Sequence, residues 1–107
     1  MVDESVGLTV RGYLRAVQAA GIHTRRAVQF GSYVLGTAHE WSDIDLVVIA
    51  PELEHPADRR LVDKLWELRA CTDARIEPVP CGEQEWETDD TRPILEIARR
   101  EGVEIAA

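Results

Sequence analysis

Two short groups of residues in this 107-residue chain have the types and spacing that chemistry on phosphates requires. Gly31-Ser32 ends a largely apolar stretch, and Asp43-Ile44-Asp45 follows after a gap of ten residues. Glycine lets an anion approach the backbone closely, and the serine hydroxyl can hydrogen-bond to it. Carboxylate oxygens are the ligands that Mg²⁺ prefers. The combination indicates metal-assisted chemistry on a nucleotide.

The aspartates stand where a carboxylate is unfavourable. The run Ile44–Ile49 is nearly all apolar and contains four β-branched residues, which predicts a buried strand. An unpaired carboxylate buried there costs several kcal/mol. Because residues two apart on a strand share a face, Asp43 and Asp45 lie about 6.6 Å apart along it. A shared cation would offset their charge.

A second strand is expected over Arg25–Phe30, followed by a short helix over Tyr33–Leu35. Ser32 then lies at the C-terminal end of one strand and Asp43 at the N-terminal end of the other. A shared site therefore requires the two strands to be antiparallel neighbours in a mixed sheet. The plainer alternative is an ordinary turn at Gly31-Ser32 with no ligand.

The segment Phe30–Leu46 resembles the signature of the DNA polymerase beta-like nucleotidyltransferase superfamily, in particular its minimal nucleotidyltransferase (MNT) branch. The Gly-Ser pair, the ten-residue gap, the Asp-x-Asp and the second glycine, Gly36, all match. The resemblance implies an α/β (α+β) fold in which helices flank a small mixed β-sheet. Many relatives carry an arginine in the helix after Gly-Ser, where this chain has Tyr33-Val34-Leu35. This difference affects the expected strength or mode of triphosphate binding and not the pair of metal-binding aspartates.

In that superfamily a third carboxylate comes from a strand after the helix that follows Asp-x-Asp. A helix predicted over residues 57–70 and a strand over Ala74–Val79 follow in that order, so the resemblance makes Glu77 the third metal ligand or general base. Asp73 is a competing candidate, and an exposed edge-strand glutamate is the ordinary alternative. Two prolines, Pro78 and Pro80, predict that this strand lies at an edge or ends there.

The resemblance therefore implies a complete set of site residues. Mg²⁺ and ATP are the expected cofactors. Catalysis and metal binding are expected from Asp43, Asp45 and Glu77, and nucleotide binding from Gly31, Ser32 and Ser42.

The remaining segments read mainly as helices. The first is expected over Ser5–Ala20 with an apolar stripe at spacings of three and four, and the last begins near Thr91 and Pro93 and is closed by Gly102. A short extension, residues 103–105, follows it. The helix over residues 57–70 should bury its apolar residues, Leu61, Val62, Leu65, Trp66 and Leu68. An acidic run around Trp86, containing Glu83, Glu85, Glu87, Asp89 and Asp90, is either a solvated face or a docking surface for a basic protein.

Length and charge narrow the class of protein. The length suits one small domain, residues 1–107, whose substrate site another chain would complete. The net charge of −8, from 20 acidic and 12 basic residues, makes nucleic acid an unlikely direct partner.

No apolar run approaches a membrane span, and the N-terminus lacks the pattern of a secretory signal, so we expect a cytoplasmic location. The two cysteines, Cys71 and Cys81, have no zinc-site spacing.

Three functions stay open. The resemblance implies the antitoxin of a two-gene pair with a HEPN-domain ribonuclease, which it would inhibit by transferring AMP to a hydroxyl, expected to be a tyrosine, of that toxin. The second hypothesis is an antitoxin that neutralises the toxin by binding alone, which the missing arginine favours. The third is a nucleotidyltransferase acting on a small molecule or an RNA end with a helical partner subunit.

Overall fold

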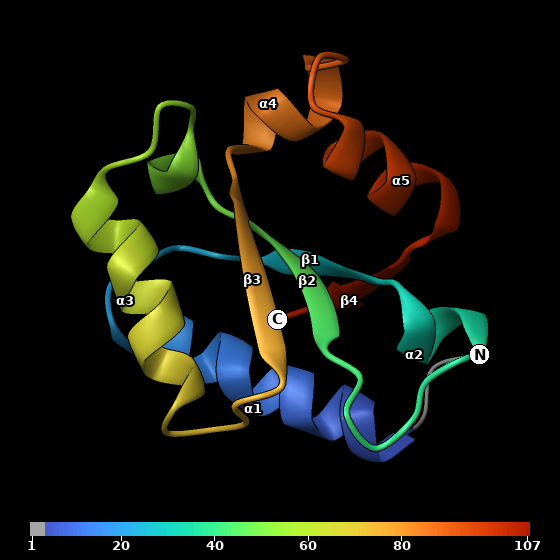
Figure 1. Ribbon diagram of the computed structural model, residues 1–107. Coiled ribbons are helices and arrows are strands. Elements are labelled where there is room, and N and C mark those ends of the chain that lie inside the picture. The colour runs from blue at the N-terminus through green and yellow to red at the C-terminus, as the bar shows by residue number, and fades with distance from the viewer. Residues whose placement is uncertain (1–3) are drawn as a thin grey trace.

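The computed structural model describes residues 4–107; residues 1–3, which carry part of the N-terminal sequence considered above, lie outside the described residues. The bounds of the helices and strands are α1 Glu4–Ala19, β1 Arg26–Phe30, α2 Ser32–Leu35, β2 Ile44–Ile49, the 3₁₀ turn η1 Pro51–Leu53, α3 Arg59–Arg69, β3 Ile76–Cys81, α4 Glu83–Thr88, α5 Pro93–Glu101 and β4 Val103–Ala106. Helices and strands alternate from α1 to α4, with a short 3₁₀ turn after β2, and α5 and a last strand complete the chain (Figure 1).

The four strands form one mixed sheet in the order β3-β2-β1-β4. Strand β1 is antiparallel to both β2 and β4, whereas β2 and β3 are parallel. The apolar strand β2 is central, as its composition predicts, and β3 with its two prolines lies at an edge. This mixed sheet with helices around it confirms the predicted fold class and the antiparallel pairing of the first two strands.

Alternation along β2 separates two hydrophobic clusters. Ile44, Leu46 and Val48 contribute to a cluster with α1 and α3, whereas Val47 and Ile49 contribute to one with α5. Figure 1 shows α4 and α5 on the far side of the sheet from α1 and α3. Asp45 and Val47 are two residues apart on β2, so their side chains point to the same face of the sheet, the one that α5 covers. Asp45 lies near the N-terminal end of β2.

The predicted stripe of α1 is buried in the first cluster, and the helix is joined to α3 by a buried hydrogen bond. The Tyr13 hydroxyl donates to the carbonyl oxygen of Leu65 at 2.7 Å. The stripe residues are Val6, Val10, Tyr13, Leu14 and Val17. At 16 residues α1 is the longest helix, and none of the helices within residues 4–107 is long and apolar enough to cross a membrane.

The prediction that α3 buries its whole apolar stripe is wrong for Trp66. Only Leu65 is fully buried on this helix, and Trp66 is 41% exposed with the Arg69 guanidinium stacked 4.7 Å from its ring centre. The helix packs against the edge strand β3 and against α1, so the sheet covers only a narrow part of its surface.

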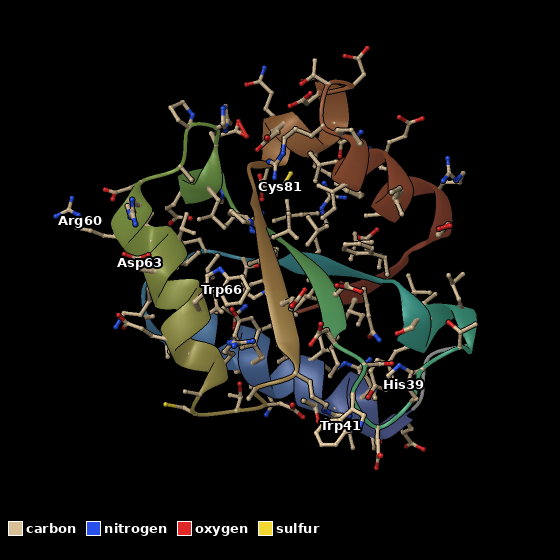
Figure 2. The ribbon with its side chains drawn as sticks, viewed as in Figure 1. His39, Trp41, Arg60, Asp63, Trp66 and Cys81 are labelled. Atoms are coloured by element: carbon tan, nitrogen blue, oxygen red, sulfur yellow. The ribbon has the colours of Figure 1, made fainter. Side chains whose placement is uncertain are left out.

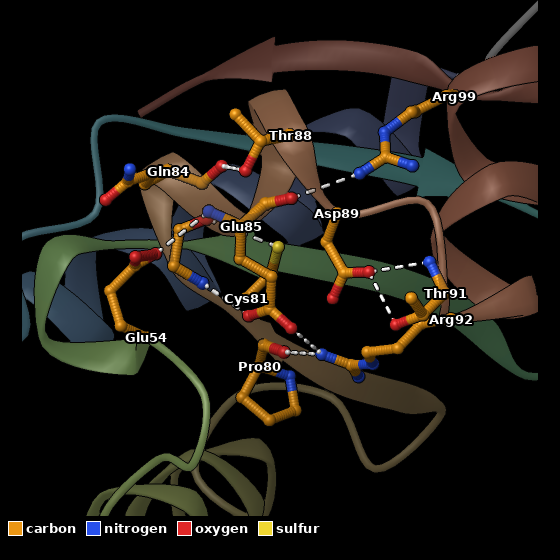
Figure 3. Close-up of polar contacts among 11 residues, drawn as sticks. Glu54, Pro80, Cys81, Gln84, Glu85, Thr88, Asp89, Thr91, Arg92 and Arg99 are labelled. Carbon is orange, nitrogen blue, oxygen red and sulfur yellow. Dashed lines mark hydrogen bonds and ion pairs between the residues drawn. The ribbon is translucent and has the colours of Figure 1, made fainter.

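The acidic run after β3 is partly internal, which corrects the expectation of a solvated face. Residues Glu83–Thr88 form helix α4, in which Glu85 is 7% exposed. Its carboxylate accepts from Arg92 at 2.7 Å and from the Gly82 N–H at 3.1 Å, and its own N–H donates to Glu54 (Figure 3). These bonds attach α4 to the segment before α3.

The C-terminal helix begins and ends where the sequence predicts, and a strand follows it. Helix α5 begins at Pro93 with Arg92 at its N-cap, ends before Gly102, and the Thr91 hydroxyl donates to Asp89. The expected short extension is strand β4, which pairs with β1 and adds a fourth strand to the sheet.

Candidate active site

The turn at Gly31 and the carboxylate of Asp45 are in direct proximity. Phe30 and Asp45 are register partners at one end of the β1–β2 ladder. Gly31 has φ 83° and ψ −158°, a conformation that is almost restricted to glycine. A methyl group on Gly31 would collide with Oδ2 of Asp45 and would lie 3.1 Å from its Cγ. Only a residue without a side chain therefore lets this carboxylate lie against the turn.

Glu77 joins the same group of carboxylates. It is the register partner of Asp45 on the neighbouring parallel strand, and its carboxyl hydrogen-bonds to Asp43. Burial first, and then the charges of Asp43 and Asp45, raise the pKa of Glu77. Burial and the charge of Asp43 likewise raise the pKa of Asp45. The structure thus brings the three predicted carboxylates together, and the nearby charge of Arg69 opposes the rise in the pKa of Glu77 without cancelling it.

Whether these residues suit a divalent cation follows from their chemistry. Within residues 4–107, no three His, Cys, Asp or Glu side chains are disposed to hold a metal ion by themselves. Mg²⁺ in nucleotide-dependent enzymes is commonly held by one or two carboxylates, with substrate phosphates and waters as further ligands. Asp43 and Asp45 supply oxygen ligands of this kind, and a cation would relieve the repulsion that raises the pKa of Asp45. The residues fit a metal that binds with a nucleotide.

The competing carboxylate, Asp73, is used elsewhere. Both of its oxygens accept from the Arg75 guanidinium, at 2.6 to 3.2 Å. These hydrogen bonds to Arg75 lower the pKa of Asp73. Asp73 is therefore an ion-pair partner of Arg75, and Glu77 is the carboxylate on this segment that meets the aspartates.

Two arginines lie near the site, and sequence reasoning missed the part of Arg75. Arg75 donates to the Tyr33 hydroxyl at 2.9 Å, with its guanidinium 5.5 Å from the ring centre, so a cation lies against the residue after Ser32. Arg69 donates to the carbonyl oxygens of Ala74 and Ile76 at 2.8 and 3.0 Å. It thereby fixes the start of the strand that carries Glu77. The contact of Arg75 with Tyr33 joins residues 42 positions apart, which no local pattern indicates, whereas the contacts of Arg69 span only five and seven residues.

The two serines have different surroundings. Ser32 begins α2 and is half-buried, and the N–H groups of Val34 and Leu35 donate to the Gly31 carbonyl. Ser42 is 8% exposed, and its hydroxyl accepts from the His39 N–H at 2.9 Å. Ser42 therefore orders the loop that leads to Asp43, and a contact of Ser42 with nucleotide stays a prediction. Figure 2 labels His39 and Trp41 on this loop, between α2 and β2.

The carboxylates lie outside a hollow in the surface of residues 4–107. That hollow, of about 480 Å³, opens at the opposite end of the sheet, between Ile22 and Arg25 before β1 and Pro51 after β2. It contains His23 and Glu83 but none of the three carboxylates. Asp43 is exposed and Asp45 half-buried, so this site faces solvent.

Comparison with known proteins identifies the fold and the family of this chain. No curated protein has a significantly similar sequence. A solved structure described as "Crystal structure of the toxin-antitoxin with AMP-PNP" superposes with a TM-score of 0.53 at 24% identity, over 88% of this chain and 70% of that one. This likeness shows a shared fold. The family description "Nucleotidyltransferase domain" matches residues 10–100, a span that runs from α1 to α5 and includes the Gly31 turn and all three carboxylates. The chain therefore belongs to the nucleotidyltransferase domain family.

Proposed function

We propose that this protein is a Mg²⁺-dependent nucleotidyltransferase that transfers AMP from ATP to a hydroxyl group, expected to be a tyrosine, of a partner HEPN-type toxin, and so acts as its antitoxin. The observation that carries the proposal is the contact between the Gly31 turn and the Asp45 carboxylate, with Asp43 and Glu77 beside it. Phosphate-binding backbone and metal-binding oxygens within one contact distance are what phosphoryl transfer needs. A cytoplasmic location, where ATP is available, is part of the proposal.

Each group has a part in the proposed reaction. Asp43 and Asp45 would hold Mg²⁺, with Glu77 as a third ligand or as the base that takes the acceptor's proton. The ion supplies neutralisation of the charge that develops on the phosphates. Gly31 and Ser32 hold the triphosphate. The acceptor oxygen forms a bond to the α-phosphorus, the bond from that phosphorus to the β-phosphate bridge breaks, and pyrophosphate leaves.

The exposure of the site favours a protein as the acceptor. The site faces solvent, and α2 has only four residues, so the described chain offers no lid over a small substrate. A protein acceptor that covers the site on binding would exclude water from it. The structure whose fold this chain resembles is described as a toxin-antitoxin complex with AMP-PNP, which supports a toxin as the partner and an adenine nucleotide as the donor.

The test is transfer of label from α-labelled ATP with Mg²⁺, with and without the protein encoded by the neighbouring gene. We expect label on that protein, and loss of label with the Asp43→Asn, Asp45→Asn double variant. A matched control is the Asp63→Asn, Asp90→Asn double variant, because both of these aspartates are exposed and lie outside the site. Label confined to an added small molecule or RNA would contradict the proposed acceptor.

A second function is favoured by two observations, the absence of a three-ligand cage within residues 4–107 and the tyrosine at position 33. In this alternative the protein neutralises its partner by binding alone. Tight binding of the neighbouring protein by the native domain and by the Asp43→Asn, Asp45→Asn variant, without label on either protein, would identify it.

A further inference from the structure

We propose that Trp41 is the centre of a docking surface for the acceptor protein, and that it binds an arginine or lysine side chain of that protein. This inference rests on the proposed function in one respect, namely that the acceptor is a protein. Its evidence concerns a different part of the molecule, the loop between α2 and β2.

Trp41 is unusually exposed for its size. At 81% it is the most exposed of the large apolar side chains in residues 4–107, and Leu35, on the other side of the same loop, is 56% exposed. Tryptophan is among the residues that most often dominate the energy of a protein interface. An indole ring this exposed is therefore available as the anchor of such an interface.

The loop holds Trp41 in a defined position. The Trp41 N–H donates to Nδ1 of His39 at 3.2 Å, and the Ser42 N–H donates to the His39 carbonyl at 3.0 Å. The bond from the His39 N–H to the Ser42 hydroxyl closes the same turn. A side chain presented on an ordered turn loses less freedom on binding, which favours affinity.

Trp41 is also next to the proposed reaction centre. It precedes Asp43 by two residues, so the two Cα atoms are at most about 7 Å apart. An acceptor hydroxyl that reaches the carboxylates brings the surface around it against this loop. The indole would then help to orient the acceptor as well as to bind it.

The other tryptophans indicate what kind of group Trp41 binds. Trp66 carries the guanidinium of Arg69 at 4.7 Å, and Trp86 carries that of Arg99 at 5.0 Å. Of the three tryptophans, all within the described residues, Trp41 is the one on which the structure shows no cation of this chain. Such a contact is attractive because the face of the indole ring is negative.

The charges beside Trp41 favour the same partner. Glu40 is exposed directly before it, and the chain as a whole has a net charge of −8. A basic patch on the acceptor would pair with Glu40 while one of its cations lies on the indole. A nucleobase stacked on Trp41 would not use the neighbouring negative charge, so a basic protein surface is the better match.

The experiment measures binding of the native domain to the protein encoded by the neighbouring gene, by calorimetry and by transfer of label from ATP. We expect Trp41→Ala to raise the Kd at least about 30-fold, as loss of an interface hot spot does. Trp41→Phe keeps an aromatic face and should recover most of the affinity. The matched control is Trp66→Ala, because Trp66 is a 41% exposed tryptophan on α3, outside the loop between α2 and β2. It should leave the Kd within about twofold, as residues outside an interface do.

Two further measurements separate docking from nucleotide binding. Glu40→Lys should lower the association rate and reduce its dependence on salt, because it reverses a charge at the rim. Binding of Mg²⁺ and ATP to the free domain should be the same for the native protein and for Trp41→Ala, and their melting temperatures should agree.

Each outcome bears on one proposal or the other. An unchanged Kd for Trp41→Ala, with label still lost in the Asp43→Asn, Asp45→Asn variant, overturns the docking surface and leaves the proposed reaction intact. Weaker ATP binding in Trp41→Ala, with partner binding unchanged, overturns it in favour of base stacking. Binding that depends on Trp41 but gives no label supports the docking surface and contradicts the reaction. Failure of the native domain to bind the neighbouring protein overturns the docking surface.

Discussion

Replacing Gly31 by alanine would test the close contact between the turn and the carboxylate of Asp45. The substitution adds a single methyl group, and that group would collide with Oδ2 of Asp45. Because Cβ atoms in real proteins keep at least 3.0 Å from other heavy atoms, the carboxylate has to move away from the turn. The change therefore displaces one proposed metal ligand without removing it.

Two magnitudes follow from the geometry. Alanine in the backbone conformation of Gly31 costs about 1 to 3 kcal/mol. For a domain of this size each kcal/mol lowers the melting temperature by about 4 to 8 °C. Moving the carboxylate by about 1 Å should reduce transfer of AMP by about 100-fold, since misplacement of that size disrupts the reacting geometry.

Three properties of Gly31→Ala are measured: its melting temperature, its affinity for Mg²⁺ and ATP, and its transfer of label. The control is Gly36→Ala. Gly36 also has a positive φ angle, of 77°, but a methyl group on it would have no neighbour within 4 Å. Gly36→Ala should lose about 1 to 2 kcal/mol of stability from its backbone alone. It should keep native affinity and activity. Gly31→Ala with native affinity and activity would refute the argument that this glycine makes room for Asp45.

Three further predictions use other parts of the structure. Without metal at pH 7, the Asp43→Asn, Asp45→Asn variant should be at least as stable as the native protein. Folding raises the pKa of Asp45, so ionisation of this carboxyl destabilises the native protein as the pH rises above its ordinary pKa of 3.8. The difference in stability between the two proteins should disappear below pH 3.8 in thermal unfolding with a chelator. A variant that unfolds at a much lower temperature than the native protein at pH 7 would contradict the prediction. Gln29→Leu should stabilise the fold by about 1 to 3 kcal/mol in denaturant titration, because both amide atoms of this fully buried side chain lack a hydrogen-bond partner; a loss of stability would mean that the amide is satisfied. Arg75→Met should weaken ATP binding more than Mg²⁺ binding if this cation replaces the arginine that relatives carry after Gly-Ser, and equal affinities would contradict that role.

Sequence-based prediction was most accurate for segments whose local pattern is compatible with a single structure. The strand Ile44–Ile49 has the predicted bounds because a run of β-branched apolar residues suits only a central strand. The antiparallel pairing of β1 and β2 followed from the requirement that Ser32 and Asp43 share a site. The register that sets Glu77 beside Asp45 could not be derived, because the helix between β2 and β3 is long enough for more than one pairing.

The parts that were missed depend on tertiary contacts. Strand β4 has four residues and only Ile105 buried, so it owes its existence to hydrogen bonds with β1 and not to its own pattern. Trp66 fits an apolar stripe but is 41% exposed, with the Arg69 guanidinium stacked on its ring. Glu85 reads as part of a solvated acidic run, and its burial depends on Arg92 in a later segment.

The central claim is that the turn at Gly31-Ser32 and the carboxylates of Asp43 and Asp45 form one metal and nucleotide site. The most direct measurement is a crystal structure of the protein with Mg²⁺ and a non-hydrolysable ATP analogue. It should show a metal ion about 2.1 Å from an oxygen of Asp43 and of Asp45, as Mg²⁺ coordination requires, and a triphosphate against Gly31 and Ser32. A nucleotide bound away from these residues, for example in the hollow beside Arg25, would contradict the claim.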